Sequence, residues 1–140
     1  MSDLSMFLKA NALPVENVKF IASKRFVDAK KKPIEWEIKV IETDVDELLR
    51  KECTKTIVGK RGKRTAELDV DKYSAKLCAM CTVFPNLNSA ELQDDYGVKS
   101  AEALLKKLLN SGEYTEYKAK VLEVNGYDVE MEELVDDAKN

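Results

Sequence analysis

Three cysteines are the residues of this 140-residue chain whose type and spacing could do chemistry: Cys53, Cys78 and Cys81. Cys78 and Cys81 form a C-x-x-C motif, which occurs in zinc sites and in thiol–disulfide oxidoreductases. A structural zinc site needs about four ligands, and the chain offers no fourth Cys and no His. A redox motif should begin a helix after a strand, whereas this one falls inside an expected helix. We therefore expect free, buried cysteines that serve packing.

The chain has no histidine at all, which removes the commonest general base and the commonest metal ligand. Ser-His and Cys-His nucleophile systems are therefore impossible. The carboxylates of Glu91, Asp94, Asp95 and residues 128–137 fit helix starts and solvated faces better than a cleft of convergent acids. We expect no enzymatic activity, no catalytic residues, no metal and no cofactor.

Charge is unevenly placed along the chain, although the net charge is only −3. Residues 24–32 carry five cations and one carboxylate, and residues 51–65 carry six cations and one carboxylate. Residues 128–139 carry six carboxylates and one lysine. This asymmetry predicts charged contacts with a protein partner or with another copy of the chain, as in a homo-oligomer.

The most basic stretch lies within residues 55–67, which we interpret as an exposed loop or a flexible second hairpin. Its cations could bind a protein partner, grip phosphates or remain solvated. A phosphate-binding P-loop is excluded by the spacing, and no aromatic residue is present to stack on bases. We therefore favour a protein over a nucleic acid as the partner. The candidate binding residues are Lys60, Arg61, Lys63 and Arg64.

The elements that position these residues begin with an amino-terminal arm, residues 1–14, in which residues 2–10 predict a short amphipathic helix. Residues 34–41 alternate apolar and charged residues, which predicts a strand. Paired with residues 17–27 it would complete a β-hairpin over residues 17–41, with Trp36 in the core. The expected apolar residues are Leu4, Phe7 and Leu8 on the helix, and Ile34, Trp36, Ile38 and Val40 on the strand.

Residues 43–139 are expected to be mostly helical, because apolar residues recur there at helical spacing. The expected helix starts are marked by the capping residues Thr43, Asp69, Ser89, Ser100 and Asp128. The helix that follows Asp69 should run to about residue 84, where Pro85 ends it. Ser111–Gly112 should end the helix that starts at Ser100.

The corner "TVFPNLNSAELQDDYG" (residues 82–97) joins two of these helices. Phe84 and Leu87 are its large apolar residues, and either could face a partner. We predict that both point inward and hold the junction together.

These elements predict an α+β fold, mainly α, with an amino-terminal β-hairpin packed on a carboxy-terminal bundle of short helices. The length fits a single domain over residues 1–140. No run of 18 apolar residues exists, and the amino terminus lacks the pattern of a secretory signal. We expect a cytoplasmic protein that does not enter a membrane.

Three collinear segments resemble the XkdN-like phage tail assembly chaperones of Gram-positive bacteria: "ASKRFVD…KPIEWEIKVI", "LDVDKYSAKLCAMCTVFPNLNSAELQDDYGV" and "AEALLKKLLNSGEYTEYKAKVLEVNGYD". The resemblance covers about residues 20–128, and its ordered set of motifs is more specific than any one of them. It implies a non-enzymatic protein of the bacterial host cytoplasm that binds the tape measure protein and keeps it soluble while tail-tube subunits polymerise. Such chaperones are expected to be absent from the finished tail.

Two other functions remain open from the residues themselves. The chain could be a structural tail component, such as a completion or baseplate protein, or a small nucleic-acid-binding module that uses the basic stretch. The resemblance favours the chaperone, with the tail-tube protein as a possible second partner.

Overall fold

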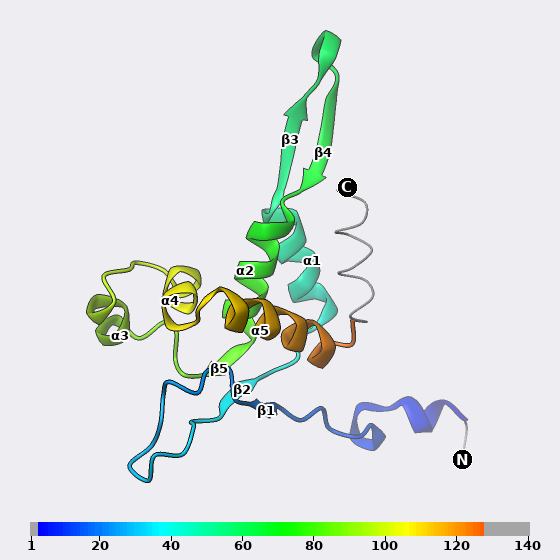
Figure 1. Ribbon diagram of the computed structural model, residues 1–140. Coiled ribbons are helices and arrows are strands. Elements are labelled where there is room, and N and C mark those ends of the chain that lie inside the picture. Colours follow the sequence, from blue (N-terminus) through cyan, green and yellow to red (C-terminus); the bar gives the residue numbers. More distant parts are fainter. Residues whose placement is uncertain (1–2, 128–140) are drawn as a thin grey trace.

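A three-stranded antiparallel sheet and five helices make up most of the computed structural model, which describes residues 3–127 (Figure 1). Strand β1 (Val18–Phe20) pairs with β2 (Trp36–Ile38), so that Val18 faces Ile38 and Phe20 faces Trp36. The predicted hairpin is therefore formed. Its second strand is shorter than the predicted residues 34–41. Of the four alternating apolar residues, Trp36 and Ile38 are buried in this strand, while Val40 lies beyond it and is exposed.

The sheet has a third strand that the sequence pattern did not indicate. Helix α2 (Val70–Cys81) ends before Thr82, and Thr82–Phe84 form strand β5, which pairs with the other edge of β2. The prediction of a helix to residue 84 was wrong at this end. These residues pair with β2 as a strand instead of continuing the helix. At the junction, the Lys39 N–H donates to the Cys81 carbonyl (2.8 Å).

Helix starts follow local side-chain hydrogen bonds at most of the expected positions. The side chains of Asp69, Ser89 and Ser100 accept from the backbone N–H three residues on, which begins α2, α3 (Ala90–Asp95) and α4 (Ala101–Leu108). Helix α1 (Thr43–Glu52) differs, because Glu42 occupies the cap position without a side-chain bond and Thr43 is already helical.

Helix α5 (Ser111–Val124) also begins differently from the prediction. Asn110 and Glu113 form a reciprocal capping box, with both N–H···O distances at 2.9 Å. Ser111 and Gly112, expected to end the preceding helix, therefore lie in the first turn of α5. The acidic helix predicted after Asp128 lies outside the described residues.

The core forms where α2 packs against α1, α4 and α5, and where Tyr117 of α5 meets the sheet (Figure 1). The Tyr117 ring lies edge-on to Trp36 with ring centroids 5.2 Å apart, and its hydroxyl is 2.6 Å from Thr82 Oγ1. Trp36 is 2% exposed, as predicted for a core residue. The fold is α+β and mainly α, with the hairpin packed on the helices, which confirms the predicted class.

Two segments project from this body (Figure 1). Strands β3 (Thr54–Val58) and β4 (Arg64–Leu68) form a two-stranded hairpin in which Lys55 pairs with Glu67 and Val58 with Arg64. We call residues 54–68 the basic arm. Of the two alternatives for residues 55–67, an exposed loop or a second hairpin, the structure shows the hairpin.

The second projecting segment is amino-terminal. In place of the predicted amphipathic helix it contains two short 3-10 helices, η1 (Asp3–Phe7) and η2 (Lys9–Asn11). Its large apolar side chains are exposed, with Phe7 82% accessible, and the segment extends away from the rest of the described chain (Figure 1). The exposed set is Leu4, Met6, Phe7, Leu8, Leu13 and Val15.

Within residues 3–127, none of the helices has both the length and the apolar content required to cross a bilayer.

Candidate protein-binding surfaces

An apolar groove of about 250 Å³ opens beside the sheet, where β2 and β5 approach α3 and the end of α4. Every residue that lines it is apolar or aromatic except Asp95, which supplies one carboxylate. A volume of this size lies below the usual range of about 300–1,000 Å³ for small-molecule sites, so it suits side chains of a protein partner better than a cofactor. The lining residues are Phe26, Ile34, Trp36, Phe84, Pro85, Leu92, Asp95, Tyr96 and Leu108.

The corner that follows β5 shapes this groove. The Phe84–Pro85 peptide bond is cis, and the Asn86 side chain accepts from the Asn88 N–H at 3.1 Å. The Leu87 carbonyl accepts from the Gln93 side chain at 2.8 Å, which fixes the corner to α3. Leu87 therefore points into the core, while the ring of Phe84 is left on the groove wall.

The two apolar residues of this corner have opposite environments. Leu87 is 1% exposed, so its predicted inward position is confirmed. Phe84 is 51% exposed, so the prediction that it points inward was wrong. Strand pairing explains the difference, because Phe84 ends an edge strand opposite Glu37 and has no element covering its outer side.

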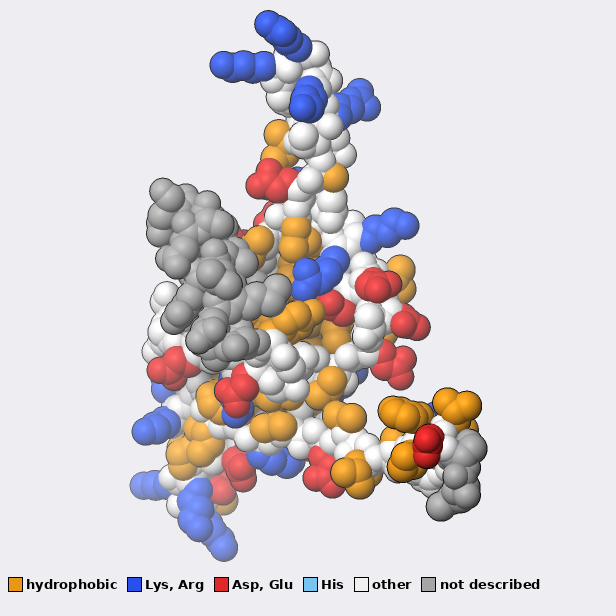
Figure 2. All heavy atoms as spheres, turned by 90° about the vertical axis from the view of Figure 1, so that its right-hand side faces the viewer, with side chains coloured by type: hydrophobic (Ala, Val, Ile, Leu, Met, Phe, Trp, Pro, Cys, Tyr) orange, Lys and Arg blue, Asp and Glu red, His pale blue; other side chains and the backbone are white. Residues whose placement is uncertain are grey.

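The four predicted binding cations lie together at the free end of the basic arm, and Figure 2 shows Lys and Arg side chains gathered there. The turn is closed by the Gly59 N–H, which donates to the Lys63 carbonyl at 2.7 Å. Arg61 and Gly62 have φ of 64° and 71°, the left-handed region that glycine adopts without strain. Within the described part of the chain, none of these four cations takes part in an ion pair.

The basic arm and the groove are separate surfaces. The arm joins the amino end of α2 through Asp69, and β5 continues from the carboxyl end of the same helix (Figure 1). A helix of 12 residues is about 18 Å long, which sets the minimum separation. The structure therefore does not bring Phe84 together with the four cations, and Leu87 belongs to neither surface.

A polar cluster on α1 joins this helix to α2 and to Tyr127. Asp46 accepts from Arg50 Nε at 2.9 Å, from the Tyr127 hydroxyl at 3.0 Å and from the Tyr73 hydroxyl. Burial opposes the charged carboxylate, but these hydrogen bonds outweigh it and hold the pKa of Asp46 below its ordinary value. Arg50 also lies over the Tyr73 ring, 4.6 Å from its centroid. The cluster ties both α2 and Tyr127 to α1.

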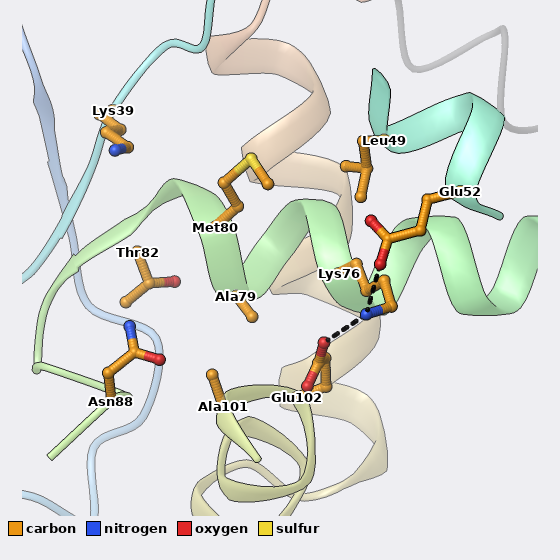
Figure 3. A pocket seen from close by; sticks show the side chains of 10 residues that line it. All are labelled: Lys39, Leu49, Glu52, Lys76, Ala79, Met80, Thr82, Asn88, Ala101 and Glu102. Carbon is orange, nitrogen blue, oxygen red and sulfur yellow. Dashed lines mark ion pairs between the residues drawn. The ribbon is translucent and has the colours of Figure 1, made fainter. Parts of the chain in front are cut away.

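A larger hollow, about 420 Å³, lies among α1, α2 and α4, and Figure 3 shows its lining. Lys76 Nζ lies between Glu102 (3.3 Å) and Glu52 (3.6 Å), so two carboxylates compensate the positive charge of the lysine. The hydrogen bond and charge of Glu102 are the main causes that raise the pKa of Lys76. A protonated lysine is no general base, so this cluster fits a structural tie between α1, α2 and α4.

The cysteines are placed as predicted, free and buried. Burial raises the pKa of Cys81 to about 11, so its thiolate is scarce at neutral pH. In the described residues, no group of three or more His, Cys, Asp or Glu side chains is arranged to hold a metal ion.

Sequence reasoning missed most of the groove. Leu92 and Tyr96 stand four residues apart on α3 and its end, a spacing that places them on one helix face. The sequence therefore contained a signal that these two residues share a surface. Ile34 belonged to the alternating pattern of residues 34–41, whereas Phe26 gave no signal, because it comes from the connection between β1 and β2 and reaches the groove only through the fold.

Comparison with known proteins gives a consistent result. Residues 4–139 match the family described as phage XkdN-like tail assembly chaperone protein. Two relatives from Bacillus subtilis (strain 168) align over 99% of this chain: the uncharacterized protein YqbN at 35% identity, covering 93% of its length, and the phage-like element PBSX protein XkdN at 34%, covering 94%. The crystal structure of YqbN has a similar fold, with a TM-score of 0.78 and 31% identity over 91% of this chain and 99% of that one.

Proposed function

The chain belongs to the phage XkdN-like tail assembly chaperone family, and on that premise we propose that it binds the tape measure protein and keeps it soluble during tail-tube assembly. A tape measure is a long amphipathic helical chain, whose apolar faces would associate if they were left in water. A chaperone for such a chain has to cover those faces reversibly. In this proposal the protein acts in the host cytoplasm and leaves the assembly before the tail is complete.

The apolar groove is the observation that carries this proposal. An amphipathic helix binds a groove by inserting apolar side chains one or two turns apart, while its polar face stays in water. Phe84 and Tyr96 supply aromatic surface for such a contact. The exposed apolar residues of the amino-terminal segment add a second surface of the same character.

The basic arm supplies the polar part of the proposed contact. Its four terminal cations can meet carboxylates on the polar face of a bound helix, which would speed association and make binding sensitive to salt. The arm contains no aromatic residue that could stack on bases, so a protein suits it better than a nucleic acid. The tail-tube protein is a further candidate partner, and homo-oligomers of the chain are compatible with the same surfaces.

The groove is tested by co-purification of the tape measure protein with the full chain carrying Phe84→Asp. Val83→Asp is the matched control, because Val83 is the preceding residue of β5, is 41% exposed and lies outside the groove. We expect Phe84→Asp to lower the recovery by about tenfold or more, the loss expected of an anchor residue. Equal recovery with both variants would show that the groove is not the binding site.

The arm is tested in the same assay by replacing its four terminal cations with serine. The control replaces the three lysines of the other basic stretch, at residues 30–32, which lie in the connection between β1 and β2. We expect weaker binding only from the arm variant, and a smaller difference at high salt. Unchanged binding would remove the arm from the interface.

A further inference from the structure

The amino-terminal segment, residues 3–15, leaves six large apolar side chains in water. Their exposed fractions run from 59% to 90%, and the residues are Leu4, Met6, Phe7, Leu8, Leu13 and Val15. The same segment carries one cation, Lys9, and one carboxylate, Asp3. Large apolar side chains gathered in one exposed segment mark a surface for contact with another molecule.

Helix η1 places two of these side chains on one side. Leu4 and Phe7 are three residues apart within Asp3–Phe7, and a 3-10 helix has three residues per turn. Leu8 follows directly, and Lys9 begins η2. The segment therefore presents a pair of large apolar side chains with a cation two residues further on.

The apolar groove beside the sheet has the complementary composition. Phe84 and Tyr96 give it aromatic surface, and Asp95 is the one charged residue in its lining. Within residues 3–127, neither Asp95 nor Lys9 takes part in an ion pair. An occupant that brings apolar side chains and one cation therefore matches the groove both in polarity and in charge.

The segment leaves the sheet at the end that lies away from the groove. Val18, the first residue of β1, pairs with Ile38, whereas the groove residues Trp36 and Phe84 stand at the other end of the sheet. In Figure 1 the segment runs to the right, and α3, which forms one wall of the groove, lies at the left. The segment is therefore directed outward, where the groove of another molecule can receive it.

From these observations we infer that the amino-terminal segment of one copy inserts into the apolar groove of a second copy, with Phe7 as the anchor side chain and Lys9 beside Asp95. The exchange is reciprocal, because the second copy offers the same segment to the first, and a closed dimer then has both grooves filled. This contact between copies does not depend on which partner the groove binds in tail assembly.

Sedimentation of the purified full chain tests the contact. We expect a concentration-dependent dimer, whose dissociation constant rises about tenfold or more for Phe7→Asp and for Phe84→Asp, the loss expected of an anchor residue and its pocket. Leu48→Asp and Val83→Asp are the matched controls, because both are exposed apolar residues outside the segment and the groove. A chain that stays monomeric, or variants that lose no more affinity than the controls, would overturn the inference.

Mixing the two variants separates segment exchange from other modes of dimerisation. The Phe7→Asp chain keeps an intact groove and the Phe84→Asp chain keeps an intact segment, so each alone lacks both contacts while a mixed dimer has one of them. We expect the mixture to associate about threefold more tightly than either variant alone, the share of one contact when the two contribute equally. Equal association of the mixture and the single variants would contradict the exchange, even where a dimer forms.

A photoreactive residue at position 7 identifies the groove that is occupied. Benzoylphenylalanine in place of Phe7 should cross-link to Phe84 or Tyr96 in the dimer. The same cross-link within a monomer would overturn the inference in favour of the chain's own groove. Cross-links to other parts of a second copy would show that the groove is not the site.

Discussion

Leu87→Ala and Phe84→Ala should differ widely in their effect on folding stability, although the two residues stand three positions apart in one corner. Leu87 is almost fully buried, so its change to alanine forfeits the transfer free energy of three carbon groups, about 2.5 kcal/mol. The space left in the core adds about 1 kcal/mol, since the corner is fixed by the Gln93 bond and cannot collapse freely. The expected total is about 3.5 kcal/mol.

Phe84→Ala should lower the free energy of unfolding by only about 1 kcal/mol, because half of the ring already contacts water and its removal widens an open groove. Urea unfolding followed by the fluorescence of Trp36, with far-UV circular dichroism as a second probe, measures both changes. In a thermal scan Leu87→Ala should lower Tm by about 10–15 °C. If Phe84→Ala proved as destabilising as Leu87→Ala, the assignment of one residue to the core and the other to a binding surface would be refuted.

The same pair separates folding from binding. Below its unfolding temperature the Leu87→Ala variant should still co-purify with the tape measure protein, because the side chain of Leu87 lies in the core and faces no partner. Phe84→Ala should remain folded and lose binding. The reverse pattern would show that partner contact takes place at the other side of the corner.

Three further outcomes are expected from the described contacts. Asn110→Ala should lower the free energy of unfolding by about 1 kcal/mol, as loss of a capping box does, while Ser111→Ala should have little effect; equal losses would contradict the observed start of α5. Because the folded pKa of Asp46 is depressed, its contribution is fully present above the unfolded value near 3.8 and disappears as pH falls through the lower folded value. Acid unfolding of Asp46→Asn should therefore be less steep than that of the wild type, and parallel curves would show that the carboxylate contributes nothing. The buried thiols should react with a disulfide reagent only after unfolding, and rapid reaction of the native chain would be inconsistent with their burial.

The likeness to the YqbN crystal structure bears on which surfaces to test first. The two chains share a fold at 31% identity, so partner binding by the two proteins can be compared in the same assay. Binding that depends only on the fold should persist when solvent-facing residues are substituted. Binding that depends on charge should weaken when the cations at the free end of the arm are removed.

Local chemistry let the sequence predict much of the helical part. A capping side chain acts on a backbone N–H three residues away, so Asp69, Ser89 and Ser100 marked helix starts without knowledge of the rest of the fold. Alternation likewise placed Trp36 and Ile38 on a buried strand face. The cysteine count and the lack of histidine limit the available chemistry by composition alone.

Only the tertiary structure decided the features that depend on distant partners. Thr82–Phe84 have no strand pattern of their own and become β5 because β2 offers a free edge. The groove exists because residues from the β1–β2 connection, β5 and α3 meet, and pairing at an edge strand leaves Phe84 uncovered there. The sequence by itself determined where the cations are concentrated; the projection of the hairpin from α1 and α2 determined that they stand about 18 Å or more from that groove.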